Sequence, residues 1–368
     1  MKVTVVGTRG FPNVQGGIET HCRELYPRLV AMGTDVTVIR RKSYINDSNR
    51  LTEFEGVRFK DIYAPRNKYL ETIVHTFFAI IYARSLKPDI LHIHAMGPSL
   101  LVPLGRLLGM KIVMTHHGAD YNRDKWGFLA KKILRLGEKA GVTRSNAVIA
   151  ISDAIKRDIS GKYNRSDINV IHNGVNQPKH SSETSYITAL GLTPGRYIVS
   201  VGRFVKEKGF DDLIDAFGPV AELGYKLVIA GDADLPDSYS ELLKRKANET
   251  STVLTGFIQG EQLRQLVDNA ALFAMTSYHE GLPIALLEAL SFGLDVVVSD
   301  IEANRLACLE EEDFYRVGDV ADLARKLLEK LSMSRRRRYD LSPYDWDYIS
   351  SQTLDVYNRV LNSGPKPK

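Results

Sequence analysis

Residues 1–39 read MKVTVVGTRGFPNVQGGIETHCRELYPRLVAMGTDVTVI, which is a strand, a helix and a second strand in succession. The segments 3–6 and 36–39 are short apolar runs rich in β-branched residues, and the apolar spacing of residues 18–32 favours a helix. Two strands joined through a crossover helix lie parallel in one sheet. The stretch therefore predicts an α/β fold whose parallel sheet is covered by helices on both faces.

The same alternation continues along the chain and then begins again. Further strands are predicted at 90–93, 111–115 and 147–151, and a second series at 197–201, 226–230, 253–254, 272–275 and 295–298, with helices at 126–140, 211–223 and 284–292. We predict two Rossmann-like, doubly wound domains that face each other across a cleft. Their expected limits are 1–178 and 195–342, with a linker at 179–194, a C-terminal helix at 343–362 and a frayed tail at 363–368.

Composition narrows the classes of protein further. Hydrophobic residues make up 44% of the 368 residues and charged residues 25%, which excludes a collagenous or mainly disordered chain. The two cysteines, Cys22 and Cys308, cannot build a disulfide framework or a thiolate zinc site. The near-apolar segment 72–83 is too short to cross a bilayer, and we identify no signal peptide. We therefore expect a cytoplasmic protein.

The charge is unevenly distributed between the two halves. Residues 1–180 carry 28 Lys and Arg against 15 Asp and Glu, a balance of +13, whereas residues 181–368 carry 21 against 29, a balance of −8. A basic half favours an anionic partner such as nucleic acid, an acidic lipid surface or a phosphorylated substrate. A solvated basic surface without any partner is the alternative.

Two loops have the composition of phosphate-binding sites. Gly16 and Gly17 open the first helix, where free backbone N–H groups and the helix dipole favour an anion, although a simple tight turn explains them equally well. Gly202 and Arg203 follow the strand 197–201, with Lys208 shortly after. An arginine and a lysine at the carboxyl end of a strand suit a diphosphate whose charge grows as it departs. Solvated loop charges are the alternative.

The most informative stretch is residues 278–293, YHEGLPIALLEALSFG. Pro283 suits the first turn of a helix in which Glu288 is the only charged residue, so we expect Glu288 to be buried and hydrogen-bonded. A carboxylate can accept two hydrogen bonds from the vicinal hydroxyls of a ribose, while Glu280 lies just before the helix and can reach a second polyol. A buried structural Glu–Arg pair is the alternative interpretation.

Histidines mark the carboxyl end of another predicted strand, where His116-His117-Gly118-Ala119-Asp120 follows 112–115. An imidazole there can donate to a sugar oxygen or accept a proton near neutral pH. His92 and His94 share one strand face, but no further ligand spacing is apparent, so we predict no metal site. The helix 126–140 places basic residues beside an apolar side and is typical either of an anionic lipid surface or of an ordinary domain helix.

Taken together, the motifs resemble those of glycosyltransferase family 4, the retaining nucleotide-sugar glycosyltransferases of GT-B fold. The similarity covers nearly the whole chain. It lies in the glycine loop 16–19, in the segments 201–203 and 207–209, and in the two glutamates Glu280 and Glu288, which are separated by seven residues. The segments 7–12, 117–121 and 125–127 look like a bacterial branch that includes rhamnosyltransferases of surface-polysaccharide assembly.

This resemblance implies a hexose or deoxyhexose transferase that acts on a nucleoside-diphosphate sugar without a metal or other cofactor. It implies that His117 contacts the sugar, that Glu288 binds the ribose, and that the donor diphosphate is held by Gly16, Gly17, Gly202, Arg203 and Lys208. The sugar itself is expected to contact Glu280 and the turn Gly281-Leu282-Pro283. His117, Glu280, Arg203 and Lys208 are the predicted catalytic residues, and the C-terminal helix is expected to brace the N-terminal domain.

The expected acceptor is a polyprenyl-diphosphate-linked or oligosaccharide glycan, with Asp120, Arg123 and Lys125 as acceptor-side candidates. Its lipid link and the basic N-terminal half predict a peripheral position at the inner face of the cell membrane. Three other functions are weighed: a GT-B-fold nucleotide-sugar epimerase, a noncatalytic nucleic-acid binder and a nicotinamide enzyme. The nucleic-acid binder would leave both glutamates without a role, and the nicotinamide enzyme lacks the Gly-x-Gly-x-x-Gly fingerprint. We therefore predict no nucleic-acid partner.

Overall fold

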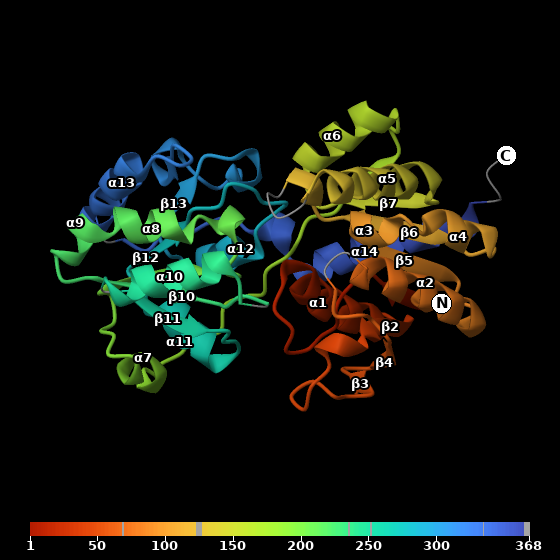
Figure 1. The fold of residues 1–368 in the computed structure, drawn as a ribbon, viewed down its shortest axis with the longest axis horizontal. Helices are drawn as coiled ribbons and strands as arrows, with labels where there is room; N and C mark the ends of the chain where they lie inside the picture. The colour runs from red at the N-terminus through yellow and green to blue at the C-terminus, as the bar shows by residue number, and fades with distance from the viewer. Residues whose placement is uncertain (68–69, 123–126, 235, 251, 334, 364–368) are drawn as a thin grey trace. The chain divides into compact units, whose positions relative to one another are not determined.

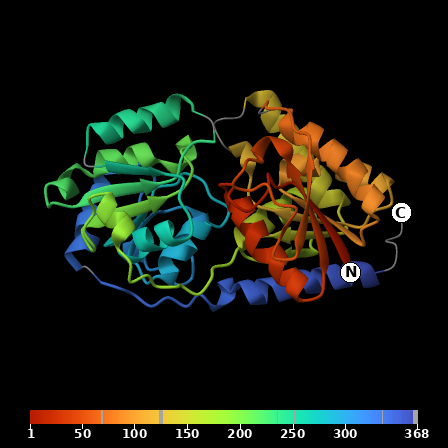
Figure 2. The ribbon, with the colours of Figure 1, turned by 90° about the horizontal axis from the view of Figure 1, so that it is seen from below.

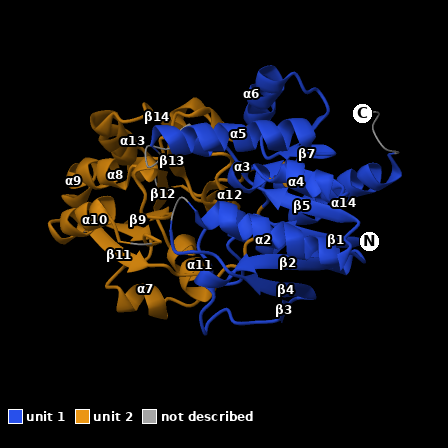
Figure 3. Cartoon of the chain, turned by 45° about the vertical axis from the view of Figure 1, so that its right-hand side comes forward, with its two compact units in different colours: residues 1–174, 344–368 blue, residues 175–343 orange. Residues whose placement is uncertain are grey.

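The computed structural model divides the chain into two compact units (Figures 1 and 3). Unit 1 comprises Met1–Gly174 together with Tyr344–Lys368, and unit 2 comprises Val175–Pro343. The structure describes all residues except 68–69, 123–126, 235, 251, 334 and 364–368. Over the described residues, no helix is both long and apolar enough to cross a membrane.

An eight-stranded sheet forms the centre of unit 1, in the order β3-β4-β2-β1-β5-β6-β7-β8. All neighbouring strands pair parallel except β3 and β4, which pair antiparallel. The strands are β1 Lys2–Val6, β2 Asp35–Arg41, β3 Glu53–Phe54, β4 Val57–Ile62, β5 Ile90–His94, β6 Ile112–His116, β7 Ala147–Ala150 and β8 Ile168–Val170.

Successive residues of each strand point to opposite faces of the sheet, so both faces carry apolar side chains. Helices cover both faces. Val3 and Val5 of β1 pack in one core cluster with α1, whereas Val6 packs in another with α2 and α4. The helices of unit 1 are α1 Gly17–Ala31, α2 Glu71–Leu86, α3 Met96–Ser99, α4 Val102–Leu107, α5 Phe128–Arg144, α6 Asp153–Tyr163 and α14 Trp346–Asn362.

The last helix, α14, belongs to unit 1 although more than half of the chain separates it from α1. It lies beside α1 (Figure 2) and buries Trp346, Ile349 and Tyr357 in the core cluster that α1 shares with β1 and β2. The side chain of Asp345 caps its N-terminus by accepting hydrogen bonds from the N–H groups of Asp347 and Tyr348. The helix α14 therefore completes the core of unit 1.

Unit 2 is built on a six-stranded sheet in the order β11-β10-β9-β12-β13-β14, and every pairing is parallel. Its strands are β9 Tyr197–Val201, β10 Lys226–Ala230, β11 Thr252–Gly256, β12 Leu272–Met275, β13 Val296–Ser299 and β14 Phe314–Tyr315. Its helices are α7 Ser185–Ala189, α8 Phe210–Ala216, α9 Gly218–Ala221, α10 Ser238–Asn248, α11 Glu261–Asp268, α12 Ile284–Ser291 and α13 Val320–Met333. Two parallel-sheet α/β units of this kind make a GT-B fold.

Two sequence-based boundaries differ from the structure. The predicted linker 179–194 contains the helix α7, and it is bonded to α11 because Ser181 N–H donates to Asp268 and Tyr186 N–H donates to Gln265. The predicted helix 211–223 is divided into α8 and α9. Pro219 has no N–H to continue the hydrogen-bond ladder, and Gly218 before it is a poor helix former.

Candidate functional site

In unit 2, the strand β9 ends at a pair of charged side chains. Gly202 continues the strand by donating its N–H to the carbonyl of Ala230, and Arg203 follows. The Arg203 guanidinium donates to the Asp234 carboxylate across 2.9 Å, and both side chains are partly exposed. Asp234 is not among the site residues predicted from the sequence. An anion bound by Arg203 would compete with this carboxylate.

A second cation–acid pair lies in the same unit. Lys208 Nζ lies 2.5 Å from Glu280 Oε1, and the Ser277 hydroxyl donates to the same oxygen across 2.6 Å. The lysine side chain is 20% exposed and the glutamate side chain 13% exposed, so both groups are sheltered yet reachable from solvent. The structure therefore brings Lys208 and Glu280 together from positions 72 residues apart.

Two hydrogen bonds to main-chain carbonyls hold the segment of Lys208 against the segment that precedes Glu280. The Thr276 hydroxyl donates to the carbonyl of Lys208 across 2.8 Å, and Tyr278 N–H donates to the carbonyl of Glu207 across 2.8 Å. Gly209 has a φ of +60°, and a Cβ there would lie 2.4 Å from the carbonyl oxygen of Thr276. This close approach requires glycine. Thr276 and Ser277 are not among the site residues predicted from the sequence, because single hydroxyls in a loop give no periodic signal.

The turn Gly281-Leu282-Pro283 leads from Glu280 into α12, which begins at Ile284. Leu282 and Pro283 are buried, and Gly281 is partly buried. Glu288 lies in α12 and is only partly buried, which corrects the prediction that its side chain is buried. The residues next to Glu288 in α12 are apolar, yet the helix is partly exposed to solvent at Glu288. An apolar sequence does not reveal which side of a short helix stays uncovered.

In unit 1, the glycine loop before α1 is organised by an acidic residue. Glu19 is buried and accepts hydrogen bonds from the Thr8 hydroxyl across 3.2 Å and from Arg9 N–H across 3.0 Å. Gly16 has a φ of +153°, and a Cβ there would lie 2.0 Å from a Glu19 carboxylate oxygen. The Gly17 position has open space around it. The loop after β1 and the start of α1 are thus held together by Glu19, which the sequence had assigned only to a motif.

His117 follows β6 and joins a cluster of buried imidazoles. His117 Nε2 lies 2.9 Å from His94 Nδ1, and the His21 ring meets the His117 ring edge-to-face with centroids 5.0 Å apart. Burial holds the pKa of both His94 and His117 well below 6.5, so both rings are neutral at pH 7. Ring nitrogens of His21, His94 and His117 lie within 4.8 Å of one another, a grouping that could hold a metal ion. The absence of a metal therefore stays a prediction.

The neighbouring acceptor-side candidates are placed only in part. His116 contributes to a different group, in which its Nε2 lies 2.8 Å from the buried Glu138 carboxylate. Asp120 begins a short 3-10 turn and is partly buried. Arg123 and Lys125 lie outside the described residues. The structure thus separates His116 from His117, which the sequence had treated together.

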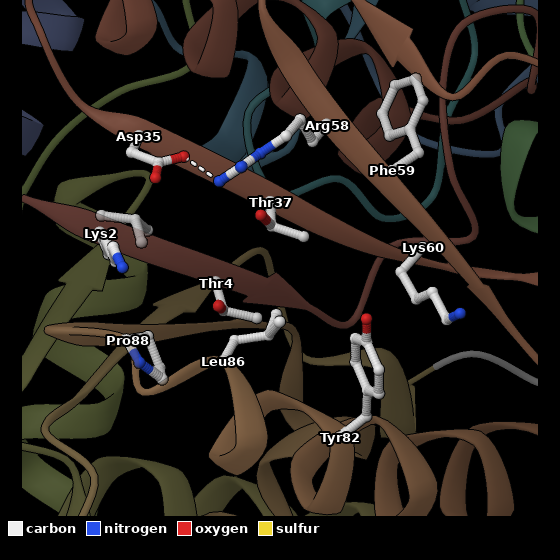
Figure 4. Close-up of a pocket in the computed structure, with 11 residues that line it drawn as sticks. Lys2, Thr4, Asp35, Thr37, Arg58, Phe59, Lys60, Tyr82, Leu86 and Pro88 are labelled. Atoms are coloured by element: carbon white, nitrogen blue, oxygen red, sulfur yellow. Dashed lines mark hydrogen bonds and ion pairs between the residues drawn. The ribbon is translucent and has the colours of Figure 1, made fainter.

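A pocket of unit 1 lies away from all of these residues (Figure 4). Lys2 and Asp35, the first residues of β1 and β2, lie at its edge, and Tyr82 and Leu86 of α2 line it. Arg58 of β4 forms an ion pair with Asp35 across it. The pocket lies toward the amino ends of β1 and β2, whereas His117 follows the carboxyl end of β6. None of the predicted site residues lines it.

Comparison with known families accounts for both units. Residues 15–177 match the model of Glycosyltransferase Family 4, and residues 187–343 match the model of Glycosyl transferases group 1. The first match begins just before Gly16 and includes His117, while the second includes Arg203, Lys208, Glu280 and Glu288. The two matches divide the chain at nearly the same place as the two compact units.

Individual proteins agree with this assignment. An uncharacterized glycosyltransferase of Methanocaldococcus jannaschii is 25% identical over 98% of this chain and 99% of its own. The GDP-mannose:cellobiosyl-diphosphopolyprenol alpha-mannosyltransferase of Xanthomonas oryzae is 25% identical over 74% of each chain. The fold is that of the sucrose-phosphate synthase of Thermosynechococcus elongatus, at 20% identity and a TM-score of 0.82 over 99% of this chain and 100% of that one. The chain is thus built from a family 4 domain followed by a group 1 domain, and it belongs to the glycosyltransferases of GT-B fold.

Proposed function

We propose that the protein is a retaining glycosyltransferase that moves a hexose or deoxyhexose from a nucleoside-diphosphate sugar to a lipid-linked or growing glycan of a bacterial surface polysaccharide. The observation that carries the proposal is the Lys208–Glu280 pair of unit 2. It combines a cation for a diphosphate with a carboxylate for sugar hydroxyls within 2.5 Å, and hydrogen bonds between their two segments hold both in place. Arg203 adds the second cation, and Glu288 is assigned to the ribose.

The proposed chemistry needs no protein nucleophile. The bond between the anomeric carbon and the phosphate oxygen breaks, and the acceptor hydroxyl forms the new glycosidic bond on the same face of the sugar. The acceptor proton passes to the departing diphosphate, which therefore takes the part of a general base. Lys208 and Arg203 stabilise the negative charge that grows on that diphosphate. Transfer is proposed to require no metal and so to continue in the presence of EDTA.

The decisive experiment uses two lysines of one turn. Lys208→Ala removes the cation beside Glu280, whereas Lys206→Ala removes an exposed lysine two residues away. Losing a charge that acts in the transition state lowers transfer by about 100-fold or more. We expect this loss for Lys208→Ala only, with both variants folded as judged by circular dichroism.

The donor is identified by thermal shifts with UDP, dTDP, GDP and ADP and their sugars, since a ligand that binds the native state raises its apparent stability. Transfer is then measured with the sugar of the nucleotide that binds. Near-wild-type turnover of Lys208→Ala would remove the assigned role. Consumption of the nucleotide sugar without any acceptor would favour the epimerase.

We also propose a lipid-linked acceptor at an anionic membrane surface. The name of the Xanthomonas relative includes a diphosphopolyprenol, and the helix α5 exposes apolar side chains beside lysines and arginines. Phe128 is 86% exposed and Leu129 70% exposed, while Lys132 and Arg135 are exposed about one and two turns further along the helix. Apolar and basic residues on one helix suit an acidic bilayer surface, which implies a position at the inner face of the membrane.

Flotation with anionic liposomes tests this part of the proposal. The wild-type protein is expected to float with vesicles that contain phosphatidylglycerol, and to do so less at high salt, because salt screens the attraction. The Phe128→Ser/Leu129→Ser variant should float less. Leu223→Ser serves as the control, because this exposed leucine lies in unit 2. Equal flotation of all three proteins, or flotation of none, would exclude α5 as the membrane contact.

A further inference from the structure

A chain of hydrogen bonds leads from His117 into the core of unit 1. His117 Nε2 lies 2.9 Å from His94 Nδ1, and the other nitrogen of His94 lies 2.5 Å from the hydroxyl of Tyr26 in α1. His92 is stacked on His94 and lies 2.6 Å from the hydroxyl of Tyr357 in α14. Of these five residues, all but His117 are fully buried. The partly exposed His117 is therefore the only member of this chain that a ligand can reach.

Each ring and each hydroxyl in this series of hydrogen bonds has a single proton to donate. Burial keeps the pKa of His92, His94 and His117 low, so each ring carries one proton at pH 7. Burial also raises the pKa of Tyr26 well above 10, so its hydroxyl keeps its single proton. Each hydrogen bond needs one donor and one acceptor, and a neutral imidazole supplies one of each. The direction of donation at one end of the chain therefore determines the direction at the other.

Distances favour one direction. Tyr26 lies nearer to His94 Nε2, at 2.5 Å, than to His92 Nδ1, at 3.0 Å, and Tyr357 lies 2.6 Å from His92 Nδ1. If each tyrosine donates to its nearer ring, His92 donates from Nε2 to the Thr115 hydroxyl across 2.7 Å. His94 then donates from Nδ1 to His117 Nε2. The opposite direction would require His94 Nε2–H to donate to the Tyr26 hydroxyl, whereas a phenol O–H is the stronger donor and an imidazole nitrogen the stronger acceptor.

We propose that Tyr26 and His94 are positioning residues that fix the tautomer of His117, so that His117 presents Nδ1–H to the site as a hydrogen-bond donor and not as a base. Among the described residues, none hydrogen-bonds to His117 Nδ1, so this N–H is available to a sugar oxygen. The inference rests on the proposed function for its ligand, because a contact between His117 and the transferred sugar is itself part of that function. A donor there is consistent with a reaction in which the departing diphosphate takes the proton.

The tautomer is measured directly by long-range proton–nitrogen NMR of the full chain labelled with 15N-histidine. The chain has nine histidines, and His117→Gln assigns the signals of His117 by their loss. We expect His117 Nδ1 to be protonated and Nε2 unprotonated in the wild type. In Tyr26→Phe the donor to His94 is removed, so the Nδ1–H population of His117 should fall. Tyr163→Phe is the matched control, since that hydroxyl bonds to Glu138 beside His116.

Two substitutions at His94 provide a further test, because only one of them keeps a hydrogen-bond donor toward His117. His94→Asn can keep an N–H donor toward His117 and should retain the wild-type tautomer, whereas His94→Leu removes the donor. Loss of one directed hydrogen bond is expected to lower the transfer rate by about tenfold in Tyr26→Phe and His94→Leu, with donor binding little changed. If His94→Leu does not fold, Tyr26→Phe still tests the relay.

Several outcomes would overturn the inference. The relay is wrong if His117 is protonated at Nε2 in the wild type, or if Tyr26→Phe leaves its tautomer unchanged. Stoichiometric metal in the purified protein, with nitrogen shifts that show coordination by His21, His94 and His117, would replace the relay by a metal site. The tautomer is read without substrate. A tautomer that depends on Tyr26 in a protein that transfers no sugar would contradict the proposed function and leave the relay standing.

Discussion

The two cations proposed to bind the diphosphate each face a carboxylate. Arg203 is paired with Asp234 and Lys208 with Glu280. The two acids differ in their surroundings, because Glu280 also accepts a hydrogen bond from Ser277 and Asp234 lies at a more exposed position. We interpret Glu280 as part of the sugar site and Asp234 as a competitor that an incoming phosphate displaces. A pair that is partly exposed contributes about 0–1 kcal/mol, so its displacement costs little.

Asp234→Asn is predicted to strengthen the binding of nucleoside diphosphates by about two- to fivefold, because Arg203 no longer has to leave a carboxylate. Isothermal titration calorimetry with the preferred nucleotide measures the change. Asp215→Asn is the control, since Asp215 pairs with Lys246 elsewhere in unit 2. Weaker binding by Asp234→Asn, with Asp215→Asn unchanged, would show that Asp234 contributes to the site instead of competing for it.

At the scale of elements, the contact between α14 and the end of the N-terminal segment depends on a glycine. A Cβ at Gly174 would lie 2.5 Å from Trp346 Cδ2 and 2.9 Å from Ile349 Cδ1. Both side chains are fully buried in the core cluster of unit 1, so neither has room to turn away. Gly174 is the last residue of the N-terminal segment of this unit, and it lets α14 pack closely there.

Gly174→Ala is therefore predicted to lower the free energy of unfolding of unit 1 by about 1–3 kcal/mol, the usual cost of overpacking a core. Chemical denaturation followed by the fluorescence of the two tryptophans measures it. Gly161→Ala in α6 is the matched control, because nothing lies near its added Cβ and alanine is the better helix former. It should be neutral or slightly stabilising. Equal stability of both variants would contradict the close packing of α14.

At the scale of the whole molecule, the histidines of unit 1 link its stability to pH. Five imidazoles of unit 1 have a lowered pKa: desolvation lowers the pKa of His21 and His75 to about 4 and of His92 to about 3, and those of His94 and of the partly exposed His117 well below 6.5. Each must stay neutral while the unit is folded. An unfolded histidine binds a proton below about pH 6.5, so acid favours the unfolded chain.

The sign of the pH dependence follows from the lowered values. Between pH 6.5 and about 4 the unfolded state binds more protons than the folded state, so the stability of unit 1 is complete above pH 6.5 and falls as the pH is lowered. Each such histidine contributes a slope of up to about 1.4 kcal/mol per pH unit. Urea denaturation at several values between pH 7.5 and 5 measures the slope. His75→Gln should reduce the slope by up to about 1.4 kcal/mol per pH unit, which corresponds to one proton. An unchanged slope would contradict the neutral state of His75.

Sequence alone determined a large part of this molecule. Periodicity placed the strands of both sheets to within two residues where it predicted them, because buried parallel strands are continuous apolar runs. The prediction that Arg203, Lys208 and Glu280 are site residues also came from local patterns, because these residues follow strand ends or precede a helix. The strands β3, β4, β8 and β14 were not predicted. Two or three residues are too few for a period in β3, β8 and β14, and β4 carries charged residues among its apolar ones.

Tertiary structure alone decided which distant residues meet. The Lys208–Glu280 pair, the Arg203–Asp234 pair and the imidazole chain of Tyr26, His94 and His117 join residues between 23 and 72 positions apart. It also decided that Glu288 is partly exposed and that α7 occupies the predicted linker. The physical reason is that hydrogen bonds and burial act through space, whereas sequence patterns report only on neighbours along one helix or strand.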